Sequence, residues 1–129
     1  MTETELRRQF EDLSLDPGVF THREHVRLAW SYLRQHSLLE VLRIFPEGLQ
    51  RFASSIGQPG LYHETITWAL LMIIAERMDV GRHAAWDEFA ATNDDLLIGS
   101  KAVLSRYYTA EILASPEARG SFRMPDRLG

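Results

Sequence analysis

The segment from Tyr62 to Met78 constrains the fold most, because it is apolar almost all the way round a helix. Its apolar residues fill more than one helical face: Ile66, Trp68, Leu70, Leu71, Met72, Ile73 and Ile74. A helix without a polar face has to be surrounded by other elements. We therefore expect this segment to form the central helix of its domain.

Capping signals mark two further helices. Thr21 and Glu24 have the spacing of a capping box and predict a helix that ends at about Gln35. Ser37 and Glu40 repeat that spacing before the next apolar run. Both signals place a hydroxyl where it accepts a hydrogen bond from the amide three residues on, so we expect helices to begin at these points.

The run after Ser37 is amphipathic. Its apolar residues alternate in steps of four and three over residues 38–56, a spacing typical of a helix packed against a neighbour. Pro46 lies inside this run and lacks an amide hydrogen, so it predicts a kink or a break near Ile44.

Weaker patterns complete the expected fold, and alternating strand patterns are scarce. Helices are expected at about residues 3–13, with Leu6, Phe10 and Leu13 facing inward, and at about 83–92 and 101–113, with a further turn from Ser115. The sequence thus predicts an all-α fold, a compact single-domain bundle of about five to six helices over residues 1–129 with an irregular tail from about residue 120.

Charge and cysteine content exclude several classes of function. The formal net charge is −4 and the basic residues do not cluster, which argues against nucleic acid as a partner. The chain has no cysteine, so disulfides, thiolate nucleophiles and thiolate-bound metals are excluded. The longest apolar run, Trp68 to Ala75, is too short to span a bilayer, and the N-terminal residues lack a secretory apolar region. We expect a cytoplasmic protein with neither nucleic acid nor membrane as partner.

Three histidines lie on inward faces near the starts of two helices. His22 and His25 share the apolar side of the helix after Thr21, and His63 projects inward from the central helix. Two histidines three residues apart can share one ion, and a third imidazole from another helix leaves a coordination position open. The first turn of a helix also favours the neutral, metal-binding ring. The pattern predicts a metal site on His22, His25 and His63.

Neighbouring polar residues fit this site. Glu64 or Glu24 would add a ligand or act as a base on a bound water, and Tyr62 would donate to a ligand at that water. Nitrogen and oxygen ligands alone permit Zn, Fe, Mn, Ni or Cu. The leading hypothesis is a divalent-metal-binding protein. If it is an enzyme, it would be a metal-dependent hydrolase or an oxidase or oxygenase acting on a small-molecule substrate.

The same residues have a structural interpretation. An inward histidine is commonly a hydrogen-bonded core residue, Glu24 fits a capping box, and Glu64 suits any first helical turn. The alternative function is therefore a noncatalytic helical module that binds a ligand or another protein. In that case its histidines would be structural, and the apolar face of residues 38–56 would form a homodimer interface.

A few other residues carry simpler expectations. Arg27 and Arg77 are expected to face solvent, and Asp94 and Asp95 to lie in a solvated loop. His36 is assigned to a helix end and His83 to surface or capping work. Arg127, in the tail, would either fold back onto an anionic ligand or belong to a loose end.

Three segments carry a family resemblance, "FTHREHVRLAWSYLR", "PGLYHETITWALL" and "FRMPDR". They resemble an uncharacterised family of small bacterial all-helical proteins, and the likeness covers most of the chain. This resemblance implies a helical fold and brings no established activity. The site type is loosely similar to that of DinB-like metal-binding bundles, in which three histidines from separate helices hold a divalent ion. Here two of the three histidines belong to one helix.

Overall fold

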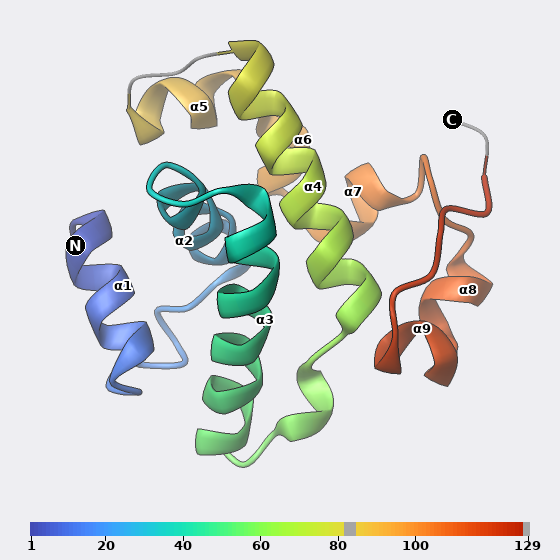
Figure 1. Cartoon of the computed structure of the whole chain (residues 1–129), viewed down its shortest axis with the longest axis horizontal. Coiled ribbons are helices and arrows are strands. Elements are labelled where there is room, and N and C mark those ends of the chain that lie inside the picture. The colour runs from blue at the N-terminus through green and yellow to red at the C-terminus, as the bar shows by residue number, and fades with distance from the viewer. Residues whose placement is uncertain (82–84, 128–129) are drawn as a thin grey trace.

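The chain folds into α-helices that pack around the helix Glu64–Gly81, as Figure 1 shows for the computed structural model. Residues 1–81 and 85–127 are described. Their elements, in order, are α1 Glu3–Glu11, α2 His22–Leu33, α3 Leu38–Ser55, the short 3-10 helix η1 Pro59–Leu61, α4 Glu64–Gly81, α5 Trp86–Thr92, α6 Asp94–Leu97, α7 Ser100–Leu104, α8 Ala110–Ala114 and α9 Pro116–Gly120.

The predicted all-α class is confirmed, since the described residues contain helices and no strand. The number of helices differs from the expected five to six. Nine α-helices lie in the described ranges, of which five have seven residues or more. The difference arises in the C-terminal third, where the expected helix over 101–113 is divided between α7 and α8, and the expected loop over 93–100 contains α6.

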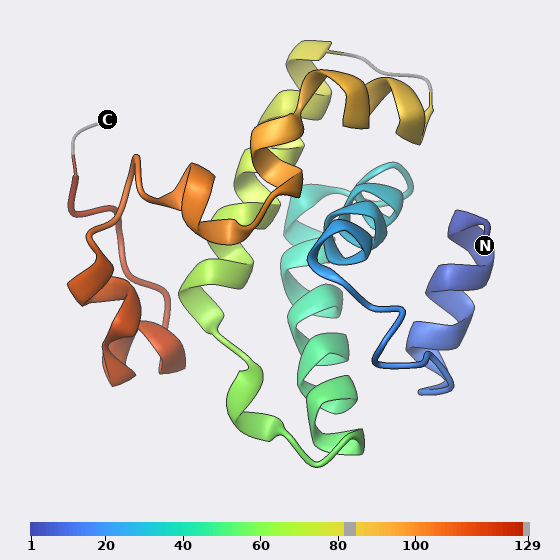
Figure 2. The same cartoon turned by 180° about the vertical axis from the view of Figure 1, so that it is seen from behind.

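The central helix is α4, as its all-round apolar character predicts. It packs against α2, α3, α7 and α9. Two opposite views show the same layout: α1 flanks α2 and α3 on one side, and α8 and α9 flank α4 on the other (Figures 1 and 2). Seen from behind, α6 and α7 run across α4 (Figure 2). The buried apolar residues of these elements form one hydrophobic cluster.

Helices α2 and α3 begin where hydroxyl groups cap them. Ser37 Oγ accepts from the Glu40 amide (3.2 Å), and the Glu40 carboxylate accepts from the Ser37 amide (3.1 Å), so this capping box is complete. Thr21 Oγ1 accepts from the Glu24 amide (3.4 Å). The carboxylate of Glu24 instead pairs with Arg27 (3.2 Å). Of the predicted second capping box, only the hydrogen bond to Thr21 is therefore formed.

Helix α3 continues through Pro46, so of the predicted kink or break near Ile44 the break does not occur. The apolar face of α3 points into the bundle: Val41, Phe45, Phe52 and Ala53 are buried there. Packing of this face against α2 and α4 holds the helix together where the proline removes one backbone hydrogen bond.

Gly48 marks the place where α1 and α3 come close. A β-carbon at this position would lie 2.6 Å from Phe10 Cε2 and 2.8 Å from Phe10 Cζ. The Phe10 ring therefore occupies the space above the glycine. Phe10 and Leu6 are buried as expected, whereas Leu13 is 42% exposed and has a φ of 65°, because α1 ends at Glu11 and the chain turns away.

Arg27 and Arg77 were expected to face solvent, but each forms ion pairs within the protein. Arg27 pairs with Glu3 and Glu24, and joins the starts of α1 and α2. Arg77 donates to both carboxylate oxygens of Asp95 (2.6 and 2.8 Å), and this guanidinium holds the pKa of Asp95 below its usual value. Asp95 thus ties α6 to α4.

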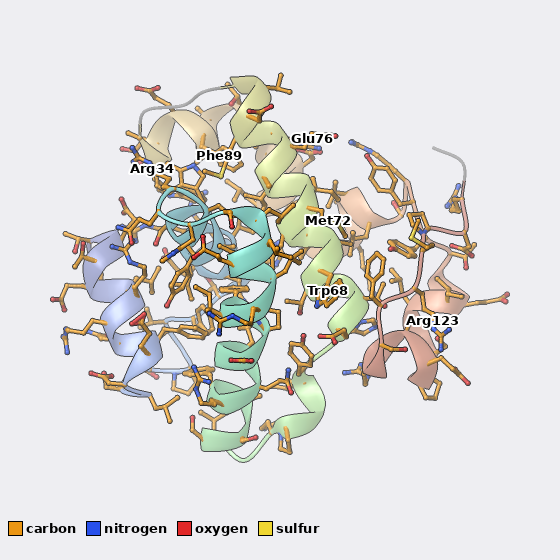
Figure 3. All side chains as sticks on the ribbon, in the orientation of Figure 1. Arg34, Trp68, Met72, Glu76, Phe89 and Arg123 are labelled. Atoms are coloured by element: carbon orange, nitrogen blue, oxygen red, sulfur yellow. The ribbon has the colours of Figure 1, made fainter. Side chains whose placement is uncertain are left out.

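The segment 121–127 has no helix but is fastened to the bundle, in contrast to a loose tail. Thr65 Oγ1 donates to the Ser121 carbonyl and accepts from the Arg123 amide, both at 3.1 Å. The Phe122 ring stacks on Trp68 at 5.4 Å between centroids, and the Arg127 amide donates to the Tyr107 carbonyl (3.0 Å). Figure 3 shows Trp68, Met72 and Glu76 in a row along α4, with Arg123 beyond them in the C-terminal segment.

A search of the helices in the described ranges finds none with the length and apolar character needed to cross a bilayer.

Candidate functional site

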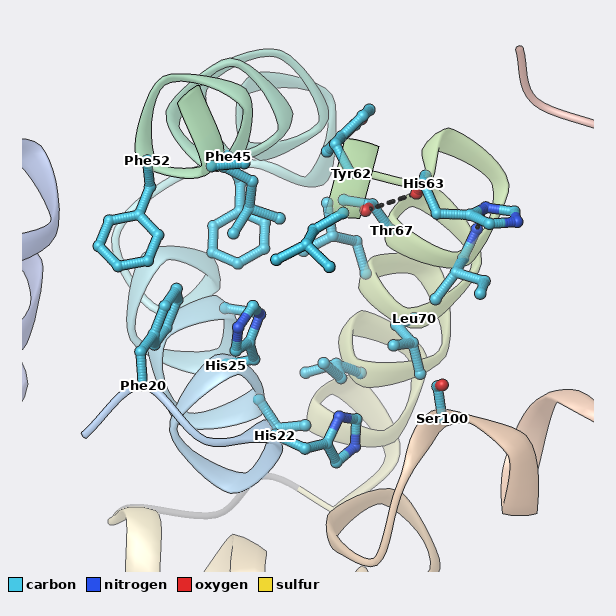
Figure 4. Close-up of a pocket in the computed structure, with 18 of the residues that line it drawn as sticks. Phe20, His22, His25, Phe45, Phe52, Tyr62, His63, Thr67, Leu70 and Ser100 are labelled. Atoms are coloured by element: carbon cyan, nitrogen blue, oxygen red, sulfur yellow. Dashed lines mark hydrogen bonds between the residues drawn. The ribbon is translucent and has the colours of Figure 1, made fainter. Parts of the chain in front are cut away.

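A cavity of about 510 Å³ lies between α2, α3 and α4. Its wall is mainly aliphatic and aromatic, with Val26 and Ala29 from α2, Phe45, Leu49 and Phe52 from α3, and Ile66, Leu70 and Ile74 from α4. Figure 4 shows Phe20, Phe45 and Phe52 on one side of this space and Leu70 on the other. Two small residues, Ala29 and Ala53, also line the cavity.

His25 lines the cavity and stacks on Phe20. The two ring centroids are 3.8 Å apart and the planes differ by 10°. The ring nitrogens of His25 make no hydrogen bond with any residue in the described ranges. Burial among apolar groups, and secondarily the neighbouring charge of His22, lower the pKa of His25 to about 4. Its ring is therefore neutral at physiological pH.

His22 also lines the cavity, but one of its nitrogens is used. Nε2 lies 2.7 Å from the carbonyl oxygen of Leu96, and because a carbonyl only accepts, Nε2 carries the proton. This bond ties the first turn of α2 to the end of α6. Ser100, at the start of α7, is nearby in the lining, and its hydroxyl makes no hydrogen bond within the described part of the chain.

His63 has both ring nitrogens engaged. Nδ1 accepts a hydrogen bond from the Ile66 amide (3.1 Å), which makes the imidazole an N-terminal cap of α4. Nε2 donates to the Leu113 carbonyl in α8 (2.7 Å). The ring is buried, at 7% exposure, and Figure 4 shows it directed away from those of His22 and His25. His63 therefore joins α4 to α8.

The predicted three-histidine metal site is not assembled by this arrangement. Leu96 and Leu113 accept from His22 and His63, so each ring is turned toward its own carbonyl. Among the described residues, no group of three or more His, Cys, Asp or Glu side chains is placed to hold a metal ion. The physical reason is that a donor bound to a nearby backbone carbonyl satisfies a buried imidazole without an ion.

The two predicted catalytic residues, Tyr62 and Glu64, form a hydrogen bond with each other. The Tyr62 hydroxyl donates to the Glu64 carboxylate. Burial, and then this carboxylate, raise the pKa of Tyr62 above its usual value. Tyr62 lines the cavity, whereas Glu64 does not. Glu24, the other candidate, is paired with Arg27 on the surface of α2.

Of the two remaining histidines, His36 does not line the cavity, and His83 is not among the described residues. His36 follows α2, as expected for a helix end, and its Nδ1 is 3.7 Å from the Glu40 carboxylate. His83, expected at the surface or in a cap, falls outside the described residues.

Sequence reasoning missed the aromatic wall of the site. This wall is formed by Phe20, Phe45 and Phe52, none of which was among the predicted site residues. One signal was available: His25 lies on the apolar stripe of α2, with an aromatic residue five positions earlier and no acidic residue on that stripe. Such a histidine has to find either a backbone partner or a cavity.

No family model, curated protein or solved structure matches this chain, so the resemblance to small bacterial helical proteins and to DinB-like bundles stays a prediction.

Proposed function

We propose that this protein binds a small, largely apolar molecule in the cavity between α2, α3 and α4. This is the noncatalytic ligand-binding alternative of the sequence analysis. The observation that carries it is the cavity itself, whose volume of about 510 Å³ falls within the usual range for small-molecule sites. Its lining has the usual character as well, an apolar wall with a few polar groups.

Binding is favoured over catalysis by the state of the polar residues. Tyr62 and Glu64 satisfy each other, and His63 has no free nitrogen. A nucleophile or base needs a free lone pair directed at the substrate. The polar groups that remain available in the lining are one ring nitrogen of His22, the ring of His25 and the Ser100 hydroxyl, and they suit recognition of a ligand.

A protein-interaction role through α3 is less favoured. The apolar face of residues 38–56 packs inside the bundle, where it forms part of the cavity wall. A homodimer built on that face would require α3 to leave α2 and α4. Small-molecule binding requires no such rearrangement.

The test is a pair of leucine-to-tryptophan variants. Leu70 lines the cavity, and Leu39 is 80% exposed on α3. Naphthalene, titrated by calorimetry and by amide chemical shifts, should bind the wild type and Leu39→Trp with one equivalent. In Leu70→Trp the indole fills the space, and we expect binding to weaken at least about tenfold.

Two results would contradict the proposal. One is the absence of saturable naphthalene binding to the wild type. The other is equal affinity in Leu70→Trp, with the thermal unfolding of both variants showing that they are folded, because the ligand would then occupy another place.

A further inference from the structure

His25 brings unused hydrogen-bonding capacity to the wall of an apolar cavity. Stacking on Phe20 at 3.8 Å covers one face of the imidazole, and it leaves free the ring edge, where the N–H and the nitrogen lone pair lie. No described residue forms a hydrogen bond there. Two other polar side chains of the lining are used inside the protein: Thr67 donates to the His63 carbonyl (2.7 Å), and the Tyr62 hydroxyl donates to Glu64. His22 keeps one ring nitrogen and Ser100 its hydroxyl, but His25 has both ring nitrogens unpaired among the described residues.

The cavity wall supplies no full charge next to His25. Within the part of the chain that the structure describes, the permanently charged residue of the lining is Arg119, which is exposed. One guanidinium nitrogen of Arg119 already donates to the carbonyls of Gly60 (2.6 Å) and Tyr62 (3.0 Å). An anion at His25 would lose its hydration without gaining a cation, which is strongly unfavourable.

A neutral imidazole has one N–H donor and one nitrogen acceptor. The matching ligand group is uncharged and can pair with either nitrogen, accepting from the N–H or donating to the bare nitrogen, as a hydroxyl can. An apolar molecule without such a group would leave a ring nitrogen of His25 dry and unpaired, at a cost in affinity. A carboxylate would be disfavoured by its charge.

From this geometry we infer that the ligand is an uncharged apolar molecule with a hydroxyl group that hydrogen-bonds to His25, such as a phenol or an alcohol with a ring or branched body. The inference rests on the proposed function and adds to it the chemical class of the ligand.

The test compares three molecules with the same two-ring body at pH 7: naphthalene, 2-naphthol and 2-naphthoate. One hydrogen bond in this setting corresponds to about a three- to tenfold gain in affinity. We therefore expect 2-naphthol to bind about three- to tenfold more tightly than naphthalene, and 2-naphthoate to bind more weakly than either.

Three variants at two histidines locate the effect. His25→Leu removes the hydrogen-bonding edge and should bring naphthol and naphthalene to equal affinity, and its thermal unfolding reports whether the variant is folded. His36→Leu removes a histidine that lies outside the cavity, and it should keep the full preference. His25→Phe, which preserves stacking on Phe20, serves as a second variant.

The outcomes separate the two proposals. Naphthalene binding without a preference for naphthol, a preference that survives in His25→Leu and His25→Phe, or tightest binding of naphthoate would overturn the ligand class and leave the binding function standing. The absence of binding by all three molecules would overturn both.

Discussion

The two cavity-side histidines of α2 differ in how the protein satisfies them. His22 has a carbonyl partner, whereas His25 has an aromatic ring on one face and no hydrogen-bond partner among the described residues. Protonation of His25 would place a charge in an apolar cavity beside His22. The protein tolerates this residue by keeping it neutral.

A pH dependence of stability follows from His25. Its folded-state pKa of about 4 lies below the ordinary value of 6.5, so the unfolded chain binds more protons between these values. Stability is then complete above about pH 6.5 and falls as the pH decreases toward 4. From pH 7 to 4.5 the wild type should lose about 2–3 kcal/mol more unfolding free energy than His25→Leu, as measured by urea unfolding. An equal loss in both proteins would show that His25 titrates normally.

His63 is predicted to stabilise the fold by joining α4 to α8. His63→Ala removes the cap at Ile66 and the bond to Leu113, and should lower the unfolding free energy by about 2–4 kcal/mol. His63→Asn restores a side-chain oxygen that can cap α4 but does not reach α8, so about 1 kcal/mol should return. Urea unfolding of both variants measures this. If Asn and Ala were equally destabilising, the capping role would be refuted.

The inward direction of these histidines could be predicted from sequence, and their partners could not. Helical periodicity places His63 on a buried face, and it is buried. Its acceptor, however, lies 50 residues further along the chain, and that of His22 lies 74 residues further. Periodicity within one helix carries no information about which distant carbonyl ends beside a ring, so a metal ion and a carbonyl were equally consistent with the sequence.

At the level of helices, local signals were reliable where the interaction itself is local. The Ser37–Glu40 box joins residues three apart and is formed as predicted. Asp95, by contrast, was assigned to a solvated loop because its partner Arg77 is 18 residues earlier, on another helix. The sequence left a break at Pro46 open for a similar reason, since the packing of α3 against α2 and α4 is not encoded in the local sequence.

The contact between α1 and α3 gives a prediction for Gly48. Alanine normally stabilises a helix interior relative to glycine by about 1 kcal/mol. At Gly48 the new methyl group would lie 2.6 Å from the Phe10 ring, and we expect a net loss of about 1–3 kcal/mol. Gly120→Ala is the matched control, because nothing lies within 4 Å of a β-carbon there. Thermal unfolding of the two variants distinguishes them, and a stabilised Gly48→Ala would mean that α1 does not pack closely on α3.

For the molecule as a whole, the hydrogen bonds of His22 and His63 to backbone carbonyls argue against the predicted metal site. An ion that binds only the folded state raises the melting temperature by mass action. With His22 and His63 held by carbonyls, we expect added Zn²⁺, Mn²⁺ or Ni²⁺ to leave the melting temperature of the untagged protein unchanged within about 1 °C. A rise of several degrees in the wild type that disappears in His63→Ala would show that the rings can leave their carbonyls and converge on an ion.

The fastening of residues 121–127 has a consequence for how the chain is made. Thr65 and Ser121 are 56 residues apart, and at about 5–20 residues per second a ribosome needs on the order of 3–11 s to synthesise the second after the first. During that interval the Trp68 side of α4 lacks the Phe122 ring that later stacks on it. The nascent protein therefore exposes the apolar ring of Trp68 for several seconds, and in this period it is most open to aggregation and to binding by a chaperone.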